Sequence, residues 1–264
     1  MRWIKIFGER HTATNALRAL LHENSDSRCI ASTSGEIAGK DISRRLEEAR
    51  KKGVTGEKAI DGIFSPDDER HAWKHCATIF RDVSVFQDAL VLISLKHPGS
   101  WLCSMFKDPY HLNSASKDIR AFMESVQPSH ERERLDCLRL RPLEIYQRKI
   151  ESYLEFQLQL DEACVEYRFV RSEDMIFCQR AVFDSLAGLL QNPTRSFTEV
   201  TTSTKKSDRT LSDYQEYYGK ELWKRELEGM ENELNEQVDW SLLKPFGYSP
   251  LLEGKNAVDR NCMI

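Results

Sequence analysis

The sequence predicts a single α/β domain in which a central, mainly parallel sheet is flanked by helices. Short apolar runs typical of strands alternate with longer amphipathic runs typical of helices, which is the order found around parallel sheets. One run, Ala89–Leu95 (ALVLISL), is apolar almost throughout, as expected for a strand covered on both faces. No repeat, low-complexity segment or Pro/Gly-rich linker divides the chain, so we expect one domain over residues 1–264.

The first strand, turn and helix are the clearest part of the N-terminal region. Residues 2–7 are predicted to form a strand, and Thr14–His22 a helix. Apolar residues recur on one face of this helix at helical spacing. They are Ala16, Leu17, Leu20 and Leu21. A short polar turn, residues 8–14, joins the two elements.

The next segment, residues 32–70, is polar, charged and poor in large apolar residues. We expect a mobile insertion that contains one charged helix, Ile42–Lys52. Ala72–Phe80 is compatible with either a strand or a helix. The sequence therefore leaves the structure of this run open.

Beyond Ala89–Leu95, the pattern continues as alternating helices and strands. Pro98 is expected to begin a helix that carries Trp101, Leu102, Met105 and Phe106. Further elements are predicted at Leu143–Leu160 (long amphipathic helix), Tyr167–Val170 (strand), Cys178–Leu190 (helix) and Asp213–Leu243 (charged, helical). Residues 249–264 are expected to be a disordered tail.

Composition excludes several classes of protein. The net charge of −4 and the pI near 6.0 argue against a general nucleic-acid-binding protein. The seven cysteines are scattered without a CxxC pair, so we expect free thiols in a reducing compartment and no zinc site. No apolar run approaches the roughly 20 residues that span a bilayer. Because the chain begins directly with a strand, we expect no signal peptide and a cytoplasmic protein.

The turn after the first strand is a candidate anion site. The first-turn amides of a helix lack intrahelical partners, and the helix dipole places partial positive charge beside them. Thr12, Thr14, Asn15 and Arg10 add side-chain donors suited to phosphate or sulfate oxygens. The alternative is that Thr12 or Thr14 is only the helix N-cap.

The same turn departs from a Walker A loop. At the spacing counted from Gly8, such a loop requires Gly-Lys-Ser/Thr where this chain has Ala13-Thr14-Asn15. The lysine that would neutralise nucleotide β- and γ-phosphates is therefore missing. A kinase or NTPase is disfavoured.

Residues 8–15, GERHTATN, resemble the 5′-phosphosulfate loop of the sulfotransferase superfamily, in particular a microbial-type branch with the pattern GERNSGTN. The resemblance implies a P-loop NTPase-like sulfotransferase fold. It also implies that Thr12, Ala13, Thr14 and Asn15 hold the 5′-phosphate of 3′-phosphoadenosine 5′-phosphosulfate through their amides. Two departures are Ala13, where the pattern has glycine, and His11, where better-known members carry a catalytic lysine. Arg10 or His11 would then take over that role.

A second motif follows the ALVLISL strand. Lys96, Pro98, Trp101 and Ser104 match the spacing of the family's 3′-phosphate motif, with lysine replacing the usual arginine. Ligands of such sheets bind beyond the carboxyl ends of the strands, where Lys96 would lie. The resemblance implies that Lys96 and Ser104 bind the 3′-phosphate. The alternative structural roles are helix initiation for Pro98 and core packing for Trp101, and we favour core packing for Trp101.

Trp73-Lys74-His75 resembles the family segment in which a Lys/His pair lies near the transferred group. Sulfuryl transfer needs positive charge over the sulfuryl oxygens and a base for the acceptor hydroxyl. We expect Lys74 and Arg10 to supply charge and His75 to act as the base. His11 and Glu9 in the loop, and His97 and His111 beside the second motif, are rivals for the role of base.

A third basic segment lies towards the C-terminus. Lys205, Lys206 and Arg209 precede a run of tyrosines, Tyr214, Tyr217 and Tyr218. In the sulfotransferase family a basic loop closes over the adenosine 3′-phosphate, so the resemblance implies the same role here. A solvated linker is the alternative.

The sequence thus predicts an enzyme that transfers a sulfuryl group from 3′-phosphoadenosine 5′-phosphosulfate to a hydroxyl, or an amine, of a small-molecule or glycan acceptor. No metal is expected, because protein cations and amides would neutralise the sulfuryl oxygens. One alternative is a non-catalytic nucleotide-binding or interaction protein with a degenerate sulfotransferase fold. A weaker alternative is a small-molecule kinase.

Overall fold

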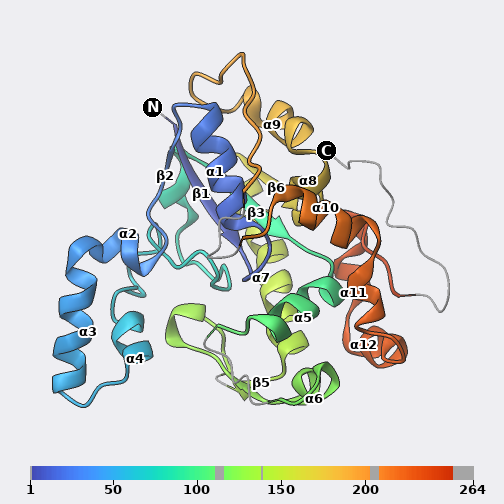
Figure 1. Cartoon of the computed structure of the whole chain (residues 1–264). Coiled ribbons are helices and arrows are strands. Elements are labelled where there is room, and N and C mark those ends of the chain that lie inside the picture. Colours follow the sequence, from blue (N-terminus) through green and yellow to red (C-terminus); the bar gives the residue numbers. More distant parts are fainter. Residues whose placement is uncertain (1, 111–115, 138, 203–207, 252–264) are drawn as a thin grey trace.

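The computed structural model describes residues 2–110, 116–137, 139–202 and 208–251. A four-stranded parallel sheet lies at the centre, with helices on both faces (Figure 1). Its strands are β1 (Trp3–Gly8), β2 (Arg28–Cys29), β3 (Ala89–Leu95) and β6 (Tyr167–Arg171), in the order β2-β1-β3-β6. A separate two-stranded antiparallel ribbon joins β4 (Gln127–Pro128) to β5 (Arg139–Leu140). The predicted α/β class with a parallel central sheet is confirmed.

Twelve α-helices are described. They are α1 (Thr14–Asn24), α2 (Ser34–Ala38), α3 (Ile42–Lys51), α4 (Gly56–Asp61), α5 (Pro98–Lys107), α6 (Ile119–Glu124), α7 (Pro142–Glu162), α8 (Ser172–Phe177), α9 (Gln179–Ala187), α10 (Leu211–Gly219), α11 (Leu222–Arg225) and α12 (Glu231–Gln237). Short 3-10 helices are η1 (Gly39–Asp41), η2 (Val83–Phe86), η3 (Glu131–Glu133), η4 (Trp240–Leu242) and η5 (Lys244–Phe246).

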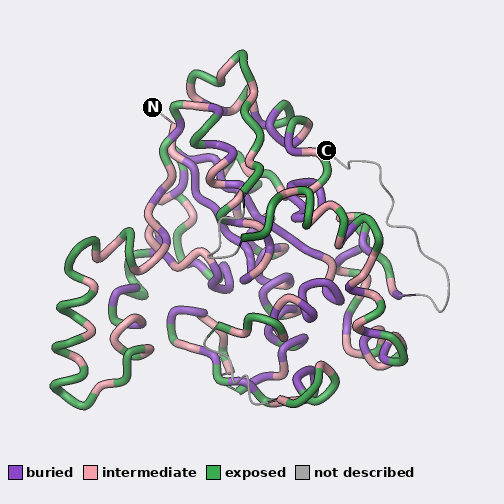
Figure 2. Tube along the Cα trace, in the orientation of Figure 1, coloured by how far each residue is buried: buried purple, intermediate pink, exposed green. Residues whose placement is uncertain are grey.

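The two faces of the sheet belong to separate hydrophobic cores. Leu90 and Leu92 of β3 pack with α1, α8 and α9, whereas Val91 and Ile93 pack with α5, α7 and the C-terminal helices. All seven residues of β3 are buried, because both faces are covered (Figure 2). The alternation follows from the period of two along a strand. It explains why every residue of this strand except Ser94 is apolar.

The segment between β2 and β3 contains more helix than expected. The predicted charged helix is present as α3, whose residues include none that is buried, and α2 and α4 flank it. In Figure 1, α3 and α4 lie side by side, away from the sheet. The run Ala72–Phe80 forms neither a strand nor a helix. The predicted helix Asp213–Leu243 is divided into α10, α11, α12 and η4.

Five cysteines are free thiols: Cys29, Cys76, Cys103, Cys137 and Cys164. Cys178 is disulfide-bonded, so the expectation of free thiols throughout is wrong for this residue. None of the helices in the described part of the chain combines the length and apolar character needed to cross a membrane. Most of the predicted tail, residues 252–264, lies outside the described residues.

Candidate functional site

The turns that follow β1 and β3 leave the sheet at the same edge. The two strands are parallel neighbours, and Gly8 at the end of β1 lies opposite Ser94 near the end of β3. The Ser94 hydroxyl donates a hydrogen bond to the carbonyl oxygen of Thr12 in the first turn. The two sequence motifs are therefore brought together in the fold.

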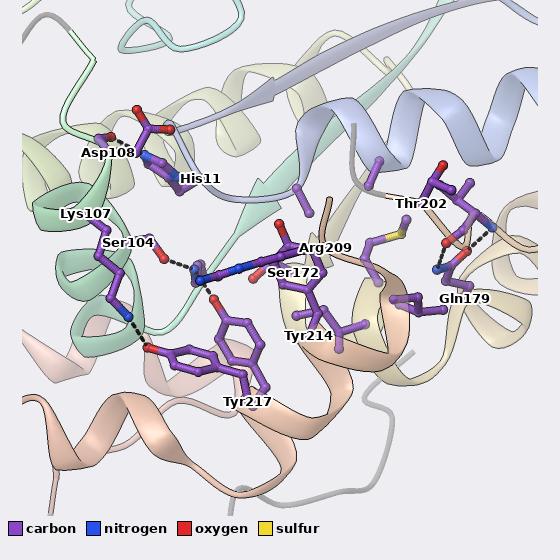
Figure 3. Close-up of a pocket in the computed structure, with 18 residues that line it drawn as sticks. His11, Ser104, Lys107, Asp108, Ser172, Gln179, Thr202, Arg209, Tyr214 and Tyr217 are labelled. Carbon is purple, nitrogen blue, oxygen red and sulfur yellow. Dashed lines mark hydrogen bonds between the residues drawn. The ribbon is translucent and has the colours of Figure 1, made fainter. Parts of the chain in front are cut away.

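A cavity of about 380 Å³ lies between these turns and helix α10 (Figure 3). His11, Ala13 and Ala16 line it from the first turn and the start of α1. Lys96 and Ser104 line it from the end of β3 and from α5. Further lining residues come from α8, from α10 and from the segments around them. They include Ser172, Met175, Ile176, Arg209, Tyr214, Tyr217 and Tyr218.

The first turn has an unusual backbone conformation. His11 and Ala13 both lie in the left-handed region, with φ values of 65° and 66°. Ala13 is the N-cap residue of α1, and no side chain caps this helix end. The interpretation of Thr12 or Thr14 as the N-cap is therefore wrong. Ala13 adopts the backbone conformation that glycine, the residue at this position of the resembled pattern, takes without strain.

The carbonyl groups of the turn are bound by hydrogen-bond donors elsewhere in the protein. The carbonyl of Gly8 accepts from His75 Nδ1 (2.6 Å), that of Glu9 from Thr12 Oγ1 (2.7 Å), and that of Arg10 from Trp101 Nε1 (2.9 Å). No described residue accepts a hydrogen bond from the first-turn amides of α1, at residues 14–16. The helix start therefore offers donors without competing carbonyl oxygens, which suits an anion.

Thr12, Thr14 and Asn15 have different surroundings. Thr12 is buried, and its hydroxyl and amide both donate to the Glu9 carbonyl, so it stabilises the turn itself. Thr14 is buried at the first position of α1. Asn15 lies outside the residues that line the cavity, and its side-chain oxygen accepts a hydrogen bond from Lys74 Nζ.

The side chain of Arg10 is bound to buried carboxylates and does not line the cavity. It is 1% exposed. Its guanidinium donates to both carboxylate oxygens of Glu133 at 3.3 Å and lies 2.7 Å from Glu9. The structure thus does not bring Arg10 to the cavity as an anion ligand, contrary to the expectation from the sequence. The sequence could not reveal this, because Glu133 lies 123 residues away.

Lys96 is a buried cation that lines the cavity. Its ammonium donates to the hydroxyls of Ser104 (2.7 Å) and Tyr218 (2.6 Å). Among the described residues, no carboxylate lies within ion-pairing distance of Lys96, which is 3% exposed. A buried ammonium without an opposite charge is costly, so this position favours binding of an anion. The predicted pairing of Lys96 with Ser104 is present.

The structural roles of the second motif are also observed. Pro98 is the first residue of α5. Trp101 is fully buried in the core, and its indole N–H binds the Arg10 carbonyl. Core packing is therefore the right interpretation for Trp101.

Lys74 and His75 do not line the cavity. Burial, and then the charge of Arg18, lowers the pKa of Lys74 to about 8. Burial and then the charge of Lys74 hold the pKa of His75 well below its ordinary value. Because His75 Nδ1 donates to the Gly8 carbonyl, its neutral ring carries the lone pair on Nε2.

The rival histidines are separated by the fold. His11 lines the cavity, and its Nε2 donates to the Asp108 carbonyl at 2.7 Å (Figure 3). His97 lies at the start of α5 against the rings of Trp223 and Trp240, with centroid distances of 4.8 and 5.4 Å. Burial lowers the pKa of His97 to about 3. Glu9 is fully buried beside Arg10, and His111 lies outside the described residues.

The C-terminal basic segment is described only in part. Arg209 lines the cavity, as do all three tyrosines of α10, whereas Lys205 and Lys206 lie outside the described residues. Lys107 and Asp108 also line the cavity and were missed from the sequence. The signal for Lys107 was its position three residues after Ser104, on the same face of α5.

The cavity is rich in cationic side chains. Lys96, Lys107 and Arg209 line it, against the one carboxylate of Asp108 among the described lining residues. Lys107 also binds Tyr217 (3.0 Å) and Glu226, which ties α5 to the segments around α10. No group of three or more His, Cys, Asp or Glu side chains suited to a metal occurs among the residues with described positions.

The chain was compared with known proteins. No protein-family model matches it. No curated protein matches it either.

Proposed function

We propose that this chain is a sulfotransferase that uses 3′-phosphoadenosine 5′-phosphosulfate. Its fold would be the P-loop-like fold of the family whose 5′-phosphosulfate loop residues 8–15 resemble. One observation carries the proposal. The start of α1 and the Lys96–Ser104 pair line the same cavity, although they are about 80 residues apart in sequence. Two separate anion-binding elements at one cavity suit a ligand with phosphate groups at both ends.

In this proposal the nucleotide lies along the cavity. Its 5′ end meets the unpaired amides at the start of α1, and its 3′-phosphate meets Lys96, Ser104 and Arg209. Apolar residues at the α8 and α10 side, including Met175 and Leu211, would contact the adenine. Tyr214, which lines the same cavity (Figure 3), adds an aromatic surface for the base.

The transfer breaks the bond between sulfur and the phosphate-bridging oxygen and forms a bond between sulfur and the acceptor oxygen. The acceptor hydroxyl loses its proton to a base, and the leaving group is adenosine 3′,5′-bisphosphate. His11 lines the cavity, so the geometry favours it over His75 for contact with the transferred group. Lys74, bound to Asn15 at the start of α1, would supply charge there.

Calorimetry with adenosine 3′,5′-bisphosphate tests the proposal. We expect a dissociation constant in the micromolar range or below, and transfer of labelled sulfate from the donor to an acceptor panel of alcohols, phenols and glycans. His11→Ala is expected to reduce turnover by about 10²–10⁴-fold if His11 is the base. Absence of bisphosphate binding at millimolar concentration would remove the proposal.

A second candidate function is nucleotide binding without catalysis. Two features favour it: the loop carries His11 where resembled members have a catalytic lysine, and His75 is buried outside the cavity. Micromolar bisphosphate binding without transfer to any acceptor would support this candidate. Binding of Mg-ATP with phosphoryl transfer would instead support the small-molecule kinase.

A further inference from the structure

Four buried charged side chains form a cluster behind the first turn. Glu9 and Arg10 come from the turn, Glu133 from η3 and Lys149 from the middle of α7. None of the four is more than 1% exposed. Arg10 Nε lies 2.7 Å from Glu9, and both Arg10 terminal nitrogens lie 3.3 Å from Glu133. Lys149 Nζ lies 2.6 Å from Glu133 and also contacts the Glu9 carboxylate.

The four side chains form a closed, neutral arrangement. Each carboxylate contacts both cations, so two negative charges balance two positive charges. A buried ion pair contributes little to stability in general, because desolvation offsets its attraction. Its best-attested use is to specify one arrangement of the chain over others. None of the four residues lines the cavity, so a direct contact with a ligand there does not explain them.

The cluster fixes the part of the turn that precedes the α1 start. With their side chains held behind the turn, the carbonyls of Glu9 and Arg10 bind Thr12 and Trp101. The next residues, His11 and Ala13, then take their left-handed backbone conformations, and α1 begins at Thr14. The two residues that Glu133 and Lys149 hold thus directly precede residues 11–16, a segment that contributes to the lining of the cavity.

We propose that Glu133 and Lys149 are positioning residues of the first turn. They act through Glu9 and Arg10 to hold residues 8–13 in the conformation that presents the α1 amides to an anion. The identity of that anion rests on the proposed function, whereas the effect on the turn does not. Arg10 is accordingly a member of this support and not a ligand of the nucleotide.

The double variant Glu133→Gln/Lys149→Met tests the proposal. It removes one negative and one positive charge while keeping side-chain size, so the cluster stays neutral and we expect a melting temperature close to that of the wild type. Amide hydrogen exchange in residues 8–16 should become at least about tenfold faster, and affinity for adenosine 3′,5′-bisphosphate should fall by about tenfold, since the turn loses charge-assisted hydrogen bonds.

Ile150→Ala is the matched control. Ile150 neighbours Lys149 on α7 and is buried in the core. This variant should melt at a lower temperature but keep the exchange of the turn and its affinity for the bisphosphate. A double variant with wild-type exchange and affinity would overturn the proposal, as would an Ile150→Ala variant with equal losses. If the wild type does not bind the bisphosphate, the proposed function fails, and the exchange measurement alone still decides the role of Glu133 and Lys149.

Discussion

The Ser94 hydroxyl donates a hydrogen bond to the carbonyl oxygen of Thr12, joining the end of β3 to the turn after β1. Both residues are buried, at 0% and 1% exposure. This contact links the two segments that both contribute residues to the lining of the cavity. The pairing of β1 with β3, which sets Gly8 opposite Ser94, therefore helps to position the first turn at the candidate site.

Ser94→Ala should therefore loosen the turn. The Thr12 carbonyl would lose a buried donor, which costs about 1–3 kcal/mol of unfolding free energy. Chemical denaturation measures this loss, and bisphosphate affinity should fall with it. Ser84→Ala, in η2, gives a control outside the cavity. Unchanged stability of Ser94→Ala would show that the contact does not support the turn.

Ala13→Gly tests the strain at the α1 start. Glycine adopts the left-handed conformation of this N-cap position more readily than alanine, so the variant should be more stable by about 0.5–1 kcal/mol. Denaturant midpoints of the two proteins measure the difference. If Ala13→Gly is less stable than the wild type, the backbone of Ala13 is not strained. The neighbouring Ala16, inside the first turn of the helix, should respond oppositely to substitution by glycine.

The half-buried His97 predicts a loss of stability in acid. Its folded pKa of about 3 lies below the ordinary value of 6.5, so below pH 6.5 the unfolded state binds more protons. The unfolding free energy should fall by about 1.4 kcal/mol per pH unit from this group as the pH drops from 6.5 towards 3. His97→Gln should show a flatter profile over this window in denaturation at several pH values. Parallel profiles would contradict the assignment.

Lys5 predicts the same rise of stability with pH, in a more alkaline window. It is fully buried in β1, where burial lowers its pKa to about 7, and its ammonium donates to the carbonyls of Arg70 and Ala72. Between pH 7 and 10.5 the unfolded chain binds more protons, so this group makes the folded state more stable as pH rises. The unfolding free energy of the wild type minus that of Lys5→Met should increase with pH in that window. A constant difference would show that Lys5 does not titrate there.

The sequence predicted the strands best where burial alone determines them. Ala89–Leu95 has the predicted boundaries, because a strand covered on both faces is apolar at nearly every position, here at all but Ser94. Ala72–Phe80 could not be assigned, because long-range hydrogen bonds hold it: Lys74 donates to Ser32, and Ala77 to Glu133. Local propensity carries no information about such partners.

In the candidate site, too, features set by local sequence were predictable and features set by long-range contacts were not. Lys96 and Ser104 were predictable because both follow one strand at a fixed helical spacing, and they meet at 2.7 Å. The orientation of the Arg10 side chain was not predictable, because it depends on two carboxylates, Glu9 in the turn and Glu133 in η3. Lys205 and Lys206 stay a prediction, since they lie outside the described residues.

The central claim is that one nucleotide bridges the start of α1 and Lys96. Calorimetry with two ligands, adenosine 3′,5′-bisphosphate and adenosine 5′-monophosphate, tests it most directly in the wild type and in Lys96→Ala. We expect Lys96→Ala to weaken the bisphosphate by at least about tenfold, since a buried charge-assisted contact is lost, and to leave the monophosphate nearly unchanged. Equal weakening of both ligands, or of neither, would contradict a nucleotide that spans the two elements.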